Sequence, residues 1–86
     1  MAGHNVIVYS TPSCVYCKLA KAYFKEKGVD FKEIDVAADQ KKAEEMIEKS
    51  GQMGVPVFVV SDDGKEEVII GYDRNRLANT LGVTPA

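Results

Sequence analysis

One stretch of the chain, residues 5–17, reads Asn5-Val6-Ile7-Val8-Tyr9-Ser10-Thr11-Pro12-Ser13-Cys14-Val15-Tyr16-Cys17 and decides the fold. Its first five residues are mostly apolar without a clean alternation, which favours a central strand that is covered on both faces. Residues 10–13 end this run, and we expect Ser13 to cap a helix that opens at Cys14. The apolar positions of that helix fall on one face and Gly28 ends it; they are Leu19, Ala20, Tyr23 and Phe24. The stretch therefore predicts a buried strand that leads into an amphipathic helix with a cysteine pair at its start.

The next segments complete a strand–helix–strand unit. Residues 31–36 alternate apolar and charged side chains, as in a strand nearer the edge of a sheet. Two strands joined by a helix in this way are expected to be parallel, with a right-handed crossover. A second helix is predicted over residues 40–50, with Asp39 as its cap and Gly51 at its end. Its apolar face is expected to consist of Ala43, Met46 and Ile47.

The last third of the chain predicts a hairpin and a helix. Residues 57–60 are wholly apolar, residues 61–65 form a polar turn, and residues 67–70 return as an antiparallel strand. Asp73 is expected to cap a final helix that buries Leu77 and Leu81 and ends at Gly82. No linker or repeat interrupts this order. We therefore expect residues 1–86 to form one α/β domain with the element order βαβαββα.

Composition limits the classes of function. The 86 residues carry a net charge of −2, which provides no field for nucleic acid or for an anionic membrane. The apolar run at residues 6–9 is too short for a signal peptide or a membrane span. Two cysteines do not make a disulfide scaffold of the secreted kind. The expected compartment is the cytoplasm, where a close cysteine pair is more often catalytic or metal-binding than structural.

The Cys14-Val15-Tyr16-Cys17 motif indicates redox chemistry. Two intervening residues place both sulfurs within one helical turn, and the helix dipole is expected to lower the pKa of a thiolate at the first turn. Cys14 is at the first exposed position and is predicted to be the nucleophile, while the more shielded Cys17 is the resolving thiol. Lys18 follows Cys14 by four residues and either lowers the Cys14 pKa further or is a solvated surface residue. Thiol–disulfide exchange requires only an accessible thiolate and a second thiol.

Three other interpretations of the cysteine pair compete with redox exchange. A zinc site needs four ligands, and this chain has no second cysteine pair and a single histidine, His4. A structural disulfide of such short span would constrain little of the unfolded chain. The cysteines could also be buried bystanders, but both would then fall at a helix start by chance. Redox exchange without a bound metal is favoured.

A proline precedes the third predicted strand, in Gly54-Val55-Pro56. Such a position is tolerated only where the missing N–H is not needed. A cis Val55–Pro56 bond would point the N–H and C=O of Val55 outward, where they can pair with an extended peptide or thiol substrate. Most X–Pro bonds are trans, so these residues alone leave the isomer open.

Taken together, four segments resemble the glutaredoxins. They are the strand ending in Tyr9-Ser10, the cysteine motif, residues 50–57 (SGQMGVPV) and Gly71-Tyr72-Asp73. The chain is most similar to the short bacterial and archaeal glutaredoxin-like proteins that include ribonucleotide-reductase electron donors, and the resemblance spans residues 6–81. It implies a thioredoxin-like fold with three helices and a four-stranded mixed sheet of order 2-1-3-4, in which strand 4 is antiparallel to strand 3. It also implies that Pro56 is cis and lies beside Cys14.

The resemblance assigns a set of glutathione contacts. Tyr16 would flank bound glutathione, the Val55 backbone would pair with its cysteine, and Gln52 would lie near its glycine carboxylate. Tyr72 and Asp73 precede a helix start, where free N–H groups hold carboxylates, and would hold the γ-glutamyl carboxylate. Three of these residues also have plain structural roles, with Tyr16 as a surface aromatic, Gln52 as a loop residue and Asp73 as a helix cap.

The chain departs from the glutaredoxin pattern at several positions. Val15 replaces a proline, Thr11 replaces a lysine that binds the glycine carboxylate, and Arg74 replaces an acid. These departures leave two main hypotheses. The first is a monomeric thiol–disulfide oxidoreductase with no bound cofactor, which reduces protein disulfides or glutathione mixed disulfides with glutathione as co-substrate. The second is an electron carrier with little glutathione affinity, reduced by thioredoxin reductase and serving a client such as ribonucleotide reductase. A third class, an iron–sulfur cluster bridged by Cys14 of two copies, is less favoured.

Overall fold

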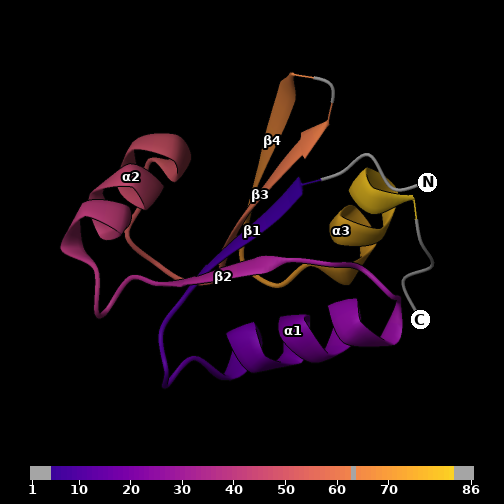
Figure 1. Cartoon of the computed structure of the whole chain (residues 1–86), viewed down its shortest axis with the longest axis horizontal. Coiled ribbons are helices and arrows are strands. Elements are labelled where there is room, and N and C mark those ends of the chain that lie inside the picture. Colours follow the sequence, from indigo (N-terminus) through magenta and orange to yellow (C-terminus); the bar gives the residue numbers. More distant parts are fainter. Residues whose placement is uncertain (1–4, 63, 83–86) are drawn as a thin grey trace.

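The computed structural model of the chain describes residues 5–62 and 64–82. The elements are, in order, β1 (Asn5–Ser10), α1 (Val15–Glu26), β2 (Lys32–Asp35), α2 (Gln40–Ser50), β3 (Val57–Asp62), β4 (Lys65–Ile70) and α3 (Arg74–Leu81). The strands form one sheet in the order β2-β1-β3-β4, as Figure 1 shows. Both the element order and the strand order predicted from the sequence are confirmed.

The strand register brings several chain segments to one end of the sheet. β1 pairs with β2 in parallel and with β3 antiparallel, so that Tyr9 lies opposite both Ile34 and Val57. β3 in turn pairs antiparallel with β4, and Val57 lies opposite Ile70. The ends of β1, β2 and β4 therefore meet the start of β3. We call this the carboxyl end of the sheet, marked by Ser10, Asp35, Val57 and Ile70.

Side chains from both faces of β1 are buried. Val6 and Val8 pack in a cluster with residues of α1 and α3, whereas Tyr9 packs in a second cluster with Met46 of α2. Accordingly, α1 and α3 cover one face of the sheet and α2 covers the other (Figure 1). The central position predicted for the first strand is confirmed.

Aromatic side chains fill the larger cluster. The ring of Phe24 on α1 meets Phe58 on β3 edge-on at 5.6 Å and lies 5.5 Å from Phe31. Such pairs add about 0.5–1.5 kcal/mol each to the gain from burying the rings. This packing holds α1 firmly on the sheet.

The buried faces of the first two helices differ in part from the prediction. In α1 the buried residues are Cys17, Ala20, Tyr23 and Phe24. Leu19 is 47% exposed, because at about 100° per residue it points well away from the direction that these four share. In α2 only Met46 is buried, and Ile47 is 37% exposed. The prediction was therefore wrong for Leu19 and Ile47.

The caps of the second and third helices are as expected. Asp39 caps α2 by accepting a hydrogen bond from the N–H of Lys42 at 3.1 Å, and Asp73 caps α3 by accepting from Arg76 at 3.1 Å. Gly51 ends α2 with φ of 73°, a left-handed conformation that favours glycine. These signals lie within a few residues of each helix end, which is why the sequence reveals them.

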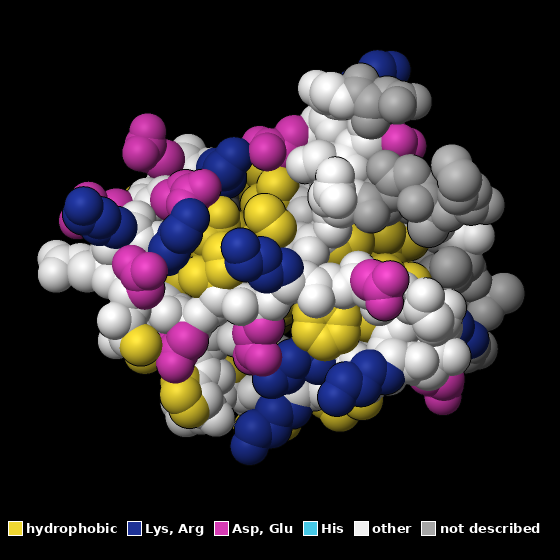
Figure 2. Space-filling model, viewed as in Figure 1, with side chains coloured by type: hydrophobic (Ala, Val, Ile, Leu, Met, Phe, Trp, Pro, Cys, Tyr) yellow, Lys and Arg dark blue, Asp and Glu magenta, His cyan; other side chains and the backbone are white. Residues whose placement is uncertain are grey.

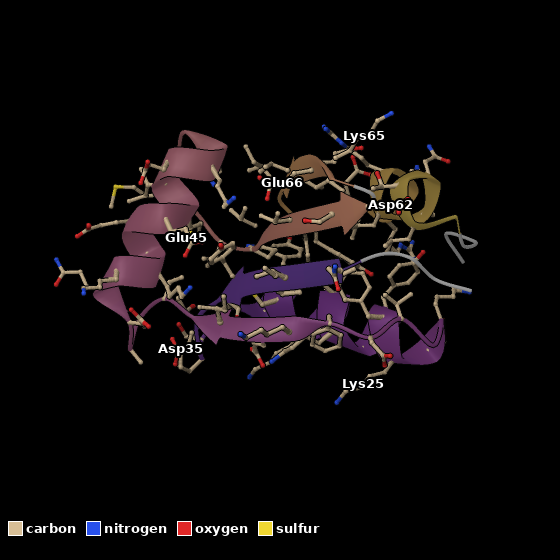
Figure 3. The ribbon with its side chains drawn as sticks, turned by 45° about the horizontal axis from the view of Figure 1, so that its top comes forward. Lys25, Asp35, Glu45, Asp62, Lys65 and Glu66 are labelled. Atoms are coloured by element: carbon tan, nitrogen blue, oxygen red, sulfur yellow. A yellow bond between two sulfur atoms is a disulfide. The ribbon has the colours of Figure 1, made fainter. Side chains whose placement is uncertain are left out.

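Charged side chains of both signs cover the surface. Figure 2 shows Lys and Arg interspersed with Asp and Glu on the face that it displays. Glu66, labelled on β4 in Figure 3, pairs with Lys49 of α2 at 2.9 Å and links that helix to the sheet edge. Such exposed pairs contribute about 0–1 kcal/mol. Among residues 5–62 and 64–82, no helix has the length and apolar character needed to cross a membrane.

Candidate redox site

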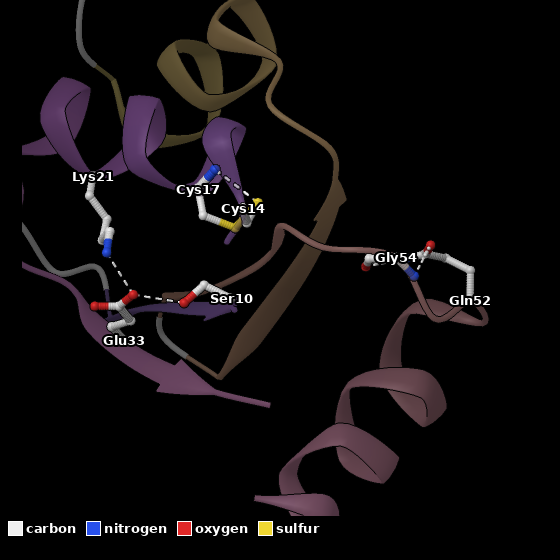
Figure 4. The surroundings of a disulfide bond; sticks show 7 residues. All are labelled: Ser10, Cys14, Cys17, Lys21, Glu33, Gln52 and Gly54. Atoms are coloured by element: carbon white, nitrogen blue, oxygen red, sulfur yellow. Dashed lines mark hydrogen bonds and ion pairs between the residues drawn. A yellow bond between two sulfur atoms is a disulfide. The ribbon is translucent and has the colours of Figure 1, made fainter. Parts of the chain in front are cut away.

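A disulfide joins Cys14 and Cys17 where β1 passes into α1, with the two Cα atoms 5.2 Å apart (Figure 4). The two cysteines differ in exposure. Cys14 is partly exposed, whereas Cys17 is 1% exposed on the buried face of α1. An incoming thiol can therefore reach the Cys14 sulfur more easily than the Cys17 sulfur. This asymmetry supports Cys14 as nucleophile and Cys17 as resolving thiol.

Cys14 itself caps α1. Its backbone is extended (φ −81°, ψ 109°), and its Sγ accepts a hydrogen bond from the N–H of Cys17 at 3.1 Å. The prediction that Ser13 is the cap was wrong, because the Cys14 sulfur occupies the position in which a capping side chain accepts. The sulfur thus lies where unpaired N–H groups and the positive end of the helix dipole favour a negative charge.

The peptide bond between Val55 and Pro56 is cis, as the resemblance implied. Pro56 is buried, and its carbonyl accepts a hydrogen bond from the Gly71 N–H at 2.9 Å, which joins the start of β3 to the end of β4. Val55 is half-buried and packs against the α2-side cluster. Because Val57 lies opposite Tyr9, Val55 and Pro56 lie at the carboxyl end, as the cysteine segment does.

Gln52 shapes the loop before Pro56. Its Nε2 donates to the Gly54 carbonyl at 2.9 Å and its Oε1 accepts from the Gly54 N–H at 2.7 Å (Figure 4). A Cβ at Gly54 would lie 2.8 Å from this Oε1, so the pairing favours glycine there. The predicted contact between Gln52 and a glycine carboxylate stays a prediction, and it would require the amide to leave Gly54. Between the two residues lies Met53, which is 77% exposed and which sequence reasoning did not single out.

Tyr72 and Asp73 lie between β4 and α3. Tyr72 is half-buried against the α1-side cluster, and Asp73 is exposed and caps α3. Because Ile70 lies opposite Val57, both residues are at the carboxyl end of the sheet. The structure thus brings the cysteine pair, Val55 and Pro56, and the start of α3 to the same end. A role for Tyr72 or Asp73 in binding remains a prediction.

The two remaining candidates lie on the exposed side of α1. Tyr16 is 61% exposed and follows Cys14 by two residues, so its ring is available to a bound molecule. Lys18 is also exposed, and its backbone N–H donates to the Cys14 carbonyl at 3.3 Å. The proposed influence of Lys18 on the Cys14 pKa stays a prediction.

Sequence reasoning missed a polar cluster between α1 and the sheet. The hydroxyl of Ser10, which is 1% exposed, donates to Glu33 Oε2 at 2.7 Å, and Lys21 Nζ donates to the same oxygen at 2.7 Å. The hydrogen bond from Lys21, followed by that from Ser10, lowers the pKa of the Glu33 carboxyl. Two features of the sequence could have pointed to this cluster. They are the four-residue spacing of Cys17 and Lys21, which places both on one helix face, and the alternation of residues 31–36.

No group of three or more metal-ligating side chains occurs in the described part of the chain. His4, the histidine considered for a metal site, lies outside the described residues.

Comparison with known proteins gives the family. The model of the glutaredoxin family matches residues 6–65. The chain belongs to the glutaredoxin family. A glutaredoxin-like 8.6 kDa protein from the rubredoxin operon of Clostridium pasteurianum is 45% identical over 67 residues, which cover 78% of this chain and 84% of that protein. Glutaredoxin 3 of Escherichia coli is 44% identical over 56 residues, which cover 65% of this chain and 68% of its own length.

A solved structure of a glutaredoxin-like protein has the same fold as this chain. The NrdH-redoxin of Escherichia coli, described as glutaredoxin-like with a thioredoxin-like activity profile, superposes with a TM-score of 0.73 at 25% identity. The match covers 90% of this chain and 93% of that one. The thioredoxin-like fold expected from the sequence is confirmed. As a glutaredoxin with a Cys14–Cys17 dithiol, the protein is a thiol–disulfide oxidoreductase that acts on disulfide-bearing partners.

Proposed function

We propose that this glutaredoxin uses glutathione as its co-substrate, reducing protein disulfides and glutathione mixed disulfides. The observation that carries the proposal is the meeting of three elements at the carboxyl end of the sheet. These are the partly exposed Cys14, the Val55 backbone before the cis bond, and the start of α3. Val55 would pair with the backbone of the glutathione cysteine, and the first N–H groups of α3 would attract its γ-glutamyl carboxylate. Tyr16 would cover the bound tripeptide.

The reaction proceeds by two exchanges. The Cys14 thiolate attacks one sulfur of a client disulfide, forming a mixed disulfide and releasing the other client sulfur as a thiolate that takes up a proton. Cys17, as a thiolate, then attacks Cys14, releases the second client thiol and leaves the Cys14–Cys17 disulfide. Two molecules of glutathione return the dithiol, and glutathione disulfide leaves.

A second candidate is the electron carrier with little glutathione affinity. Both polar atoms of Gln52 are paired with Gly54, and Thr11 stands where a lysine would bind the glycine carboxylate. Such a protein would take electrons from thioredoxin reductase and pass them to a client such as ribonucleotide reductase. The likeness to NrdH-redoxin supports this alternative.

A parallel reduction assay separates the two. The oxidised protein is incubated with NADPH and either glutathione plus glutathione reductase or thioredoxin reductase, and NADPH consumption is followed with a disulfide substrate. Faster turnover with glutathione supports the proposal, and turnover with thioredoxin reductase alone supports the carrier. A Cys14→Ser variant is the control in both arms and should be inactive.

The setting of this activity is also a proposal. A dithiol that must stay reduced between turnovers suits the cytoplasm, whose glutathione pool is reducing. We propose that the protein acts there as a monomer, without a bound cofactor, nucleic acid or membrane. Size-exclusion chromatography at micromolar concentration tests the monomeric state.

A further inference from the structure

The polar cluster of Ser10, Glu33 and Lys21 lies on the same side of the sheet as Cys17. Ser10 follows Tyr9 in β1, and Tyr9 faces α2, so Ser10 faces α1. Lys21 follows Cys17 by four residues, which places both on neighbouring turns of one helix face. In Figure 4 the side chains of Cys17 and Lys21 both extend from α1 toward the strands that carry Ser10 and Glu33.

The resolving step requires the buried Cys17 thiol to ionise. Cys17 must first lose its proton to water, and its thiolate then attacks the Cys14 sulfur of a mixed disulfide. The Cys14–Cys17 bond forms, the bond to the client breaks, and the client leaves as a thiolate that takes up a proton from water. Cys17 is 1% exposed, and burial in apolar surroundings disfavours a thiolate. Fixed charges near Cys17 therefore have a strong influence on when its proton leaves.

We propose that the Lys21–Glu33 ion pair, held by Ser10, is a positioning device that balances charge behind Cys17 and so controls the rate of the resolving step. The two charges form a close pair at 2.7 Å, and Ser10 fixes the carboxylate from the buried side. With the pair intact, the charge that changes most near Cys17 is that of Cys14. A Cys14 thiolate opposes the ionisation of Cys17, and formation of the mixed disulfide removes that charge, so Cys17 ionises when its thiolate is needed.

Other charged or titratable groups lie on the elements that meet near the cysteine pair. They are Cys14, Lys18 and Lys25 from α1 and its cap, Asp35 from β2, and Tyr72, Asp73 and Arg74 at the start of α3. Asp35 Oδ1 is held by the N–H groups of Ala37 and Ala38 at 2.9 and 3.3 Å, facing its own loop. Lys18 and Lys25 are exposed, so solvent screens them. Glu33 accepts a hydrogen bond from the buried Ser10 of β1 and pairs with Lys21, which distinguishes this ion pair from the other charged groups.

Charge balance predicts opposite effects for the two halves of the pair. Lys21→Met leaves the Glu33 carboxylate uncompensated and should disfavour the Cys17 thiolate. Glu33→Gln leaves the Lys21 ammonium and should favour it. A purely structural ion pair predicts instead that both variants loosen α1 from β2 and act in the same direction.

The test is a titration of reduced full-length protein labelled with ¹³C at the cysteine Cβ, which reports each thiol separately by NMR. We expect the Cys17 midpoint to rise by about half a pH unit or more in Lys21→Met and to fall by a similar amount in Glu33→Gln. The double variant should return close to the wild-type midpoint. The rate of resolution of a mixed disulfide at pH 7 is measured by acid quench and mass spectrometry. It should fall about twofold in Lys21→Met and rise about twofold in Glu33→Gln. These changes are small because a Cys17 thiolate that forms more readily is also a weaker nucleophile.

Lys25→Met is the matched control, because it removes the same charge one turn further from Cys17, at an exposed position. It should shift the midpoint by less than either variant of the pair. Single variants that move the midpoint in the same direction, or by no more than Lys25→Met, would overturn the proposal. Thermal melts of the oxidised variants establish that each is folded. Neither readout depends on which reductant serves the protein.

Discussion

Reduction of the disulfide should yield two thiols whose rates of alkylation differ by about two orders of magnitude. Cys14 is the partly exposed cap of α1, whereas Cys17 is 1% exposed against the sheet. A reagent reaches Cys14 directly. It reaches Cys17 only when the first turn of α1 opens.

The magnitude follows from the cost of that opening. At roughly 0.05–0.15 kcal/mol per residue, a domain of this size has about 4–13 kcal/mol of total stability. A local opening that costs about 3 kcal/mol slows Cys17 by about 150-fold. For Cys14, the N–H groups at the helix start favour the thiolate, but a more stabilised thiolate is also a weaker nucleophile, so the net gain in its rate is small. Protection of Cys17 therefore dominates the ratio.

The assay is timed alkylation of the reduced protein with iodoacetamide at pH 7, with acid quench and peptide mass spectrometry. Cys14 should be modified at least about 100-fold faster than Cys17 in buffer, and the two should react at similar rates in denaturant. The Cys14→Ser variant keeps a side chain suited to capping and should show only the slow reaction of Cys17. The reasoning is refuted if Cys17 reacts within tenfold of Cys14, or if folding does not accelerate Cys14.

Three further predictions concern single substitutions. Cys17→Ser should retain reduction of a glutathione mixed disulfide, which needs one thiol, whereas Cys14→Ser should lose it; the reverse pattern in a coupled assay would exchange the two roles. Tyr9→Phe should leave stability unchanged or raise it by up to about 1 kcal/mol, because the buried Tyr9 hydroxyl has no hydrogen-bond partner of good geometry. Burial, and next the charge of the Glu45 carboxylate, raise the pKa of Tyr9, so Glu45 is the acceptor to test. A loss of more than about 1 kcal/mol in a urea melt would show that the hydroxyl is bonded to Glu45. Glu33→Gln should flatten the dependence of stability on pH in acid. The Glu33 pKa is lowered from 4.5 on folding, so its stabilisation is complete above about pH 4.5 and is lost as pH falls through the lowered value. The carboxylate is over a third exposed, so solvent limits the effect to under about 1 kcal/mol, and parallel curves for variant and wild type would contradict it.

Local signals in the sequence were enough to predict the elements of this fold. The apolar run of residues 5–9 and the caps Asp39 and Asp73 each lie within a few residues of the structure that they specify. The hairpin was also predicted, but its turn at residues 61–65 was predicted too long, because Ser61, Asp62 and Lys65 pair within the strands. The cysteine motif at a helix start likewise placed the redox site. The strand order and the cis bond at Pro56 came from a resemblance of whole motifs, since periodicity does not carry them.

Contacts between distant segments decided the rest. Cys14 rather than Ser13 became the cap because the start of α1 depends on how the helix packs, and its packing left Leu19 exposed while burying Cys17. The bond between Ser10 and Glu33 spans 23 positions, so neither residue identifies the other in the sequence. A residue type and its neighbours set what a segment can form, but which side chains share a buried environment is set only when the strands pair and the helices cover them.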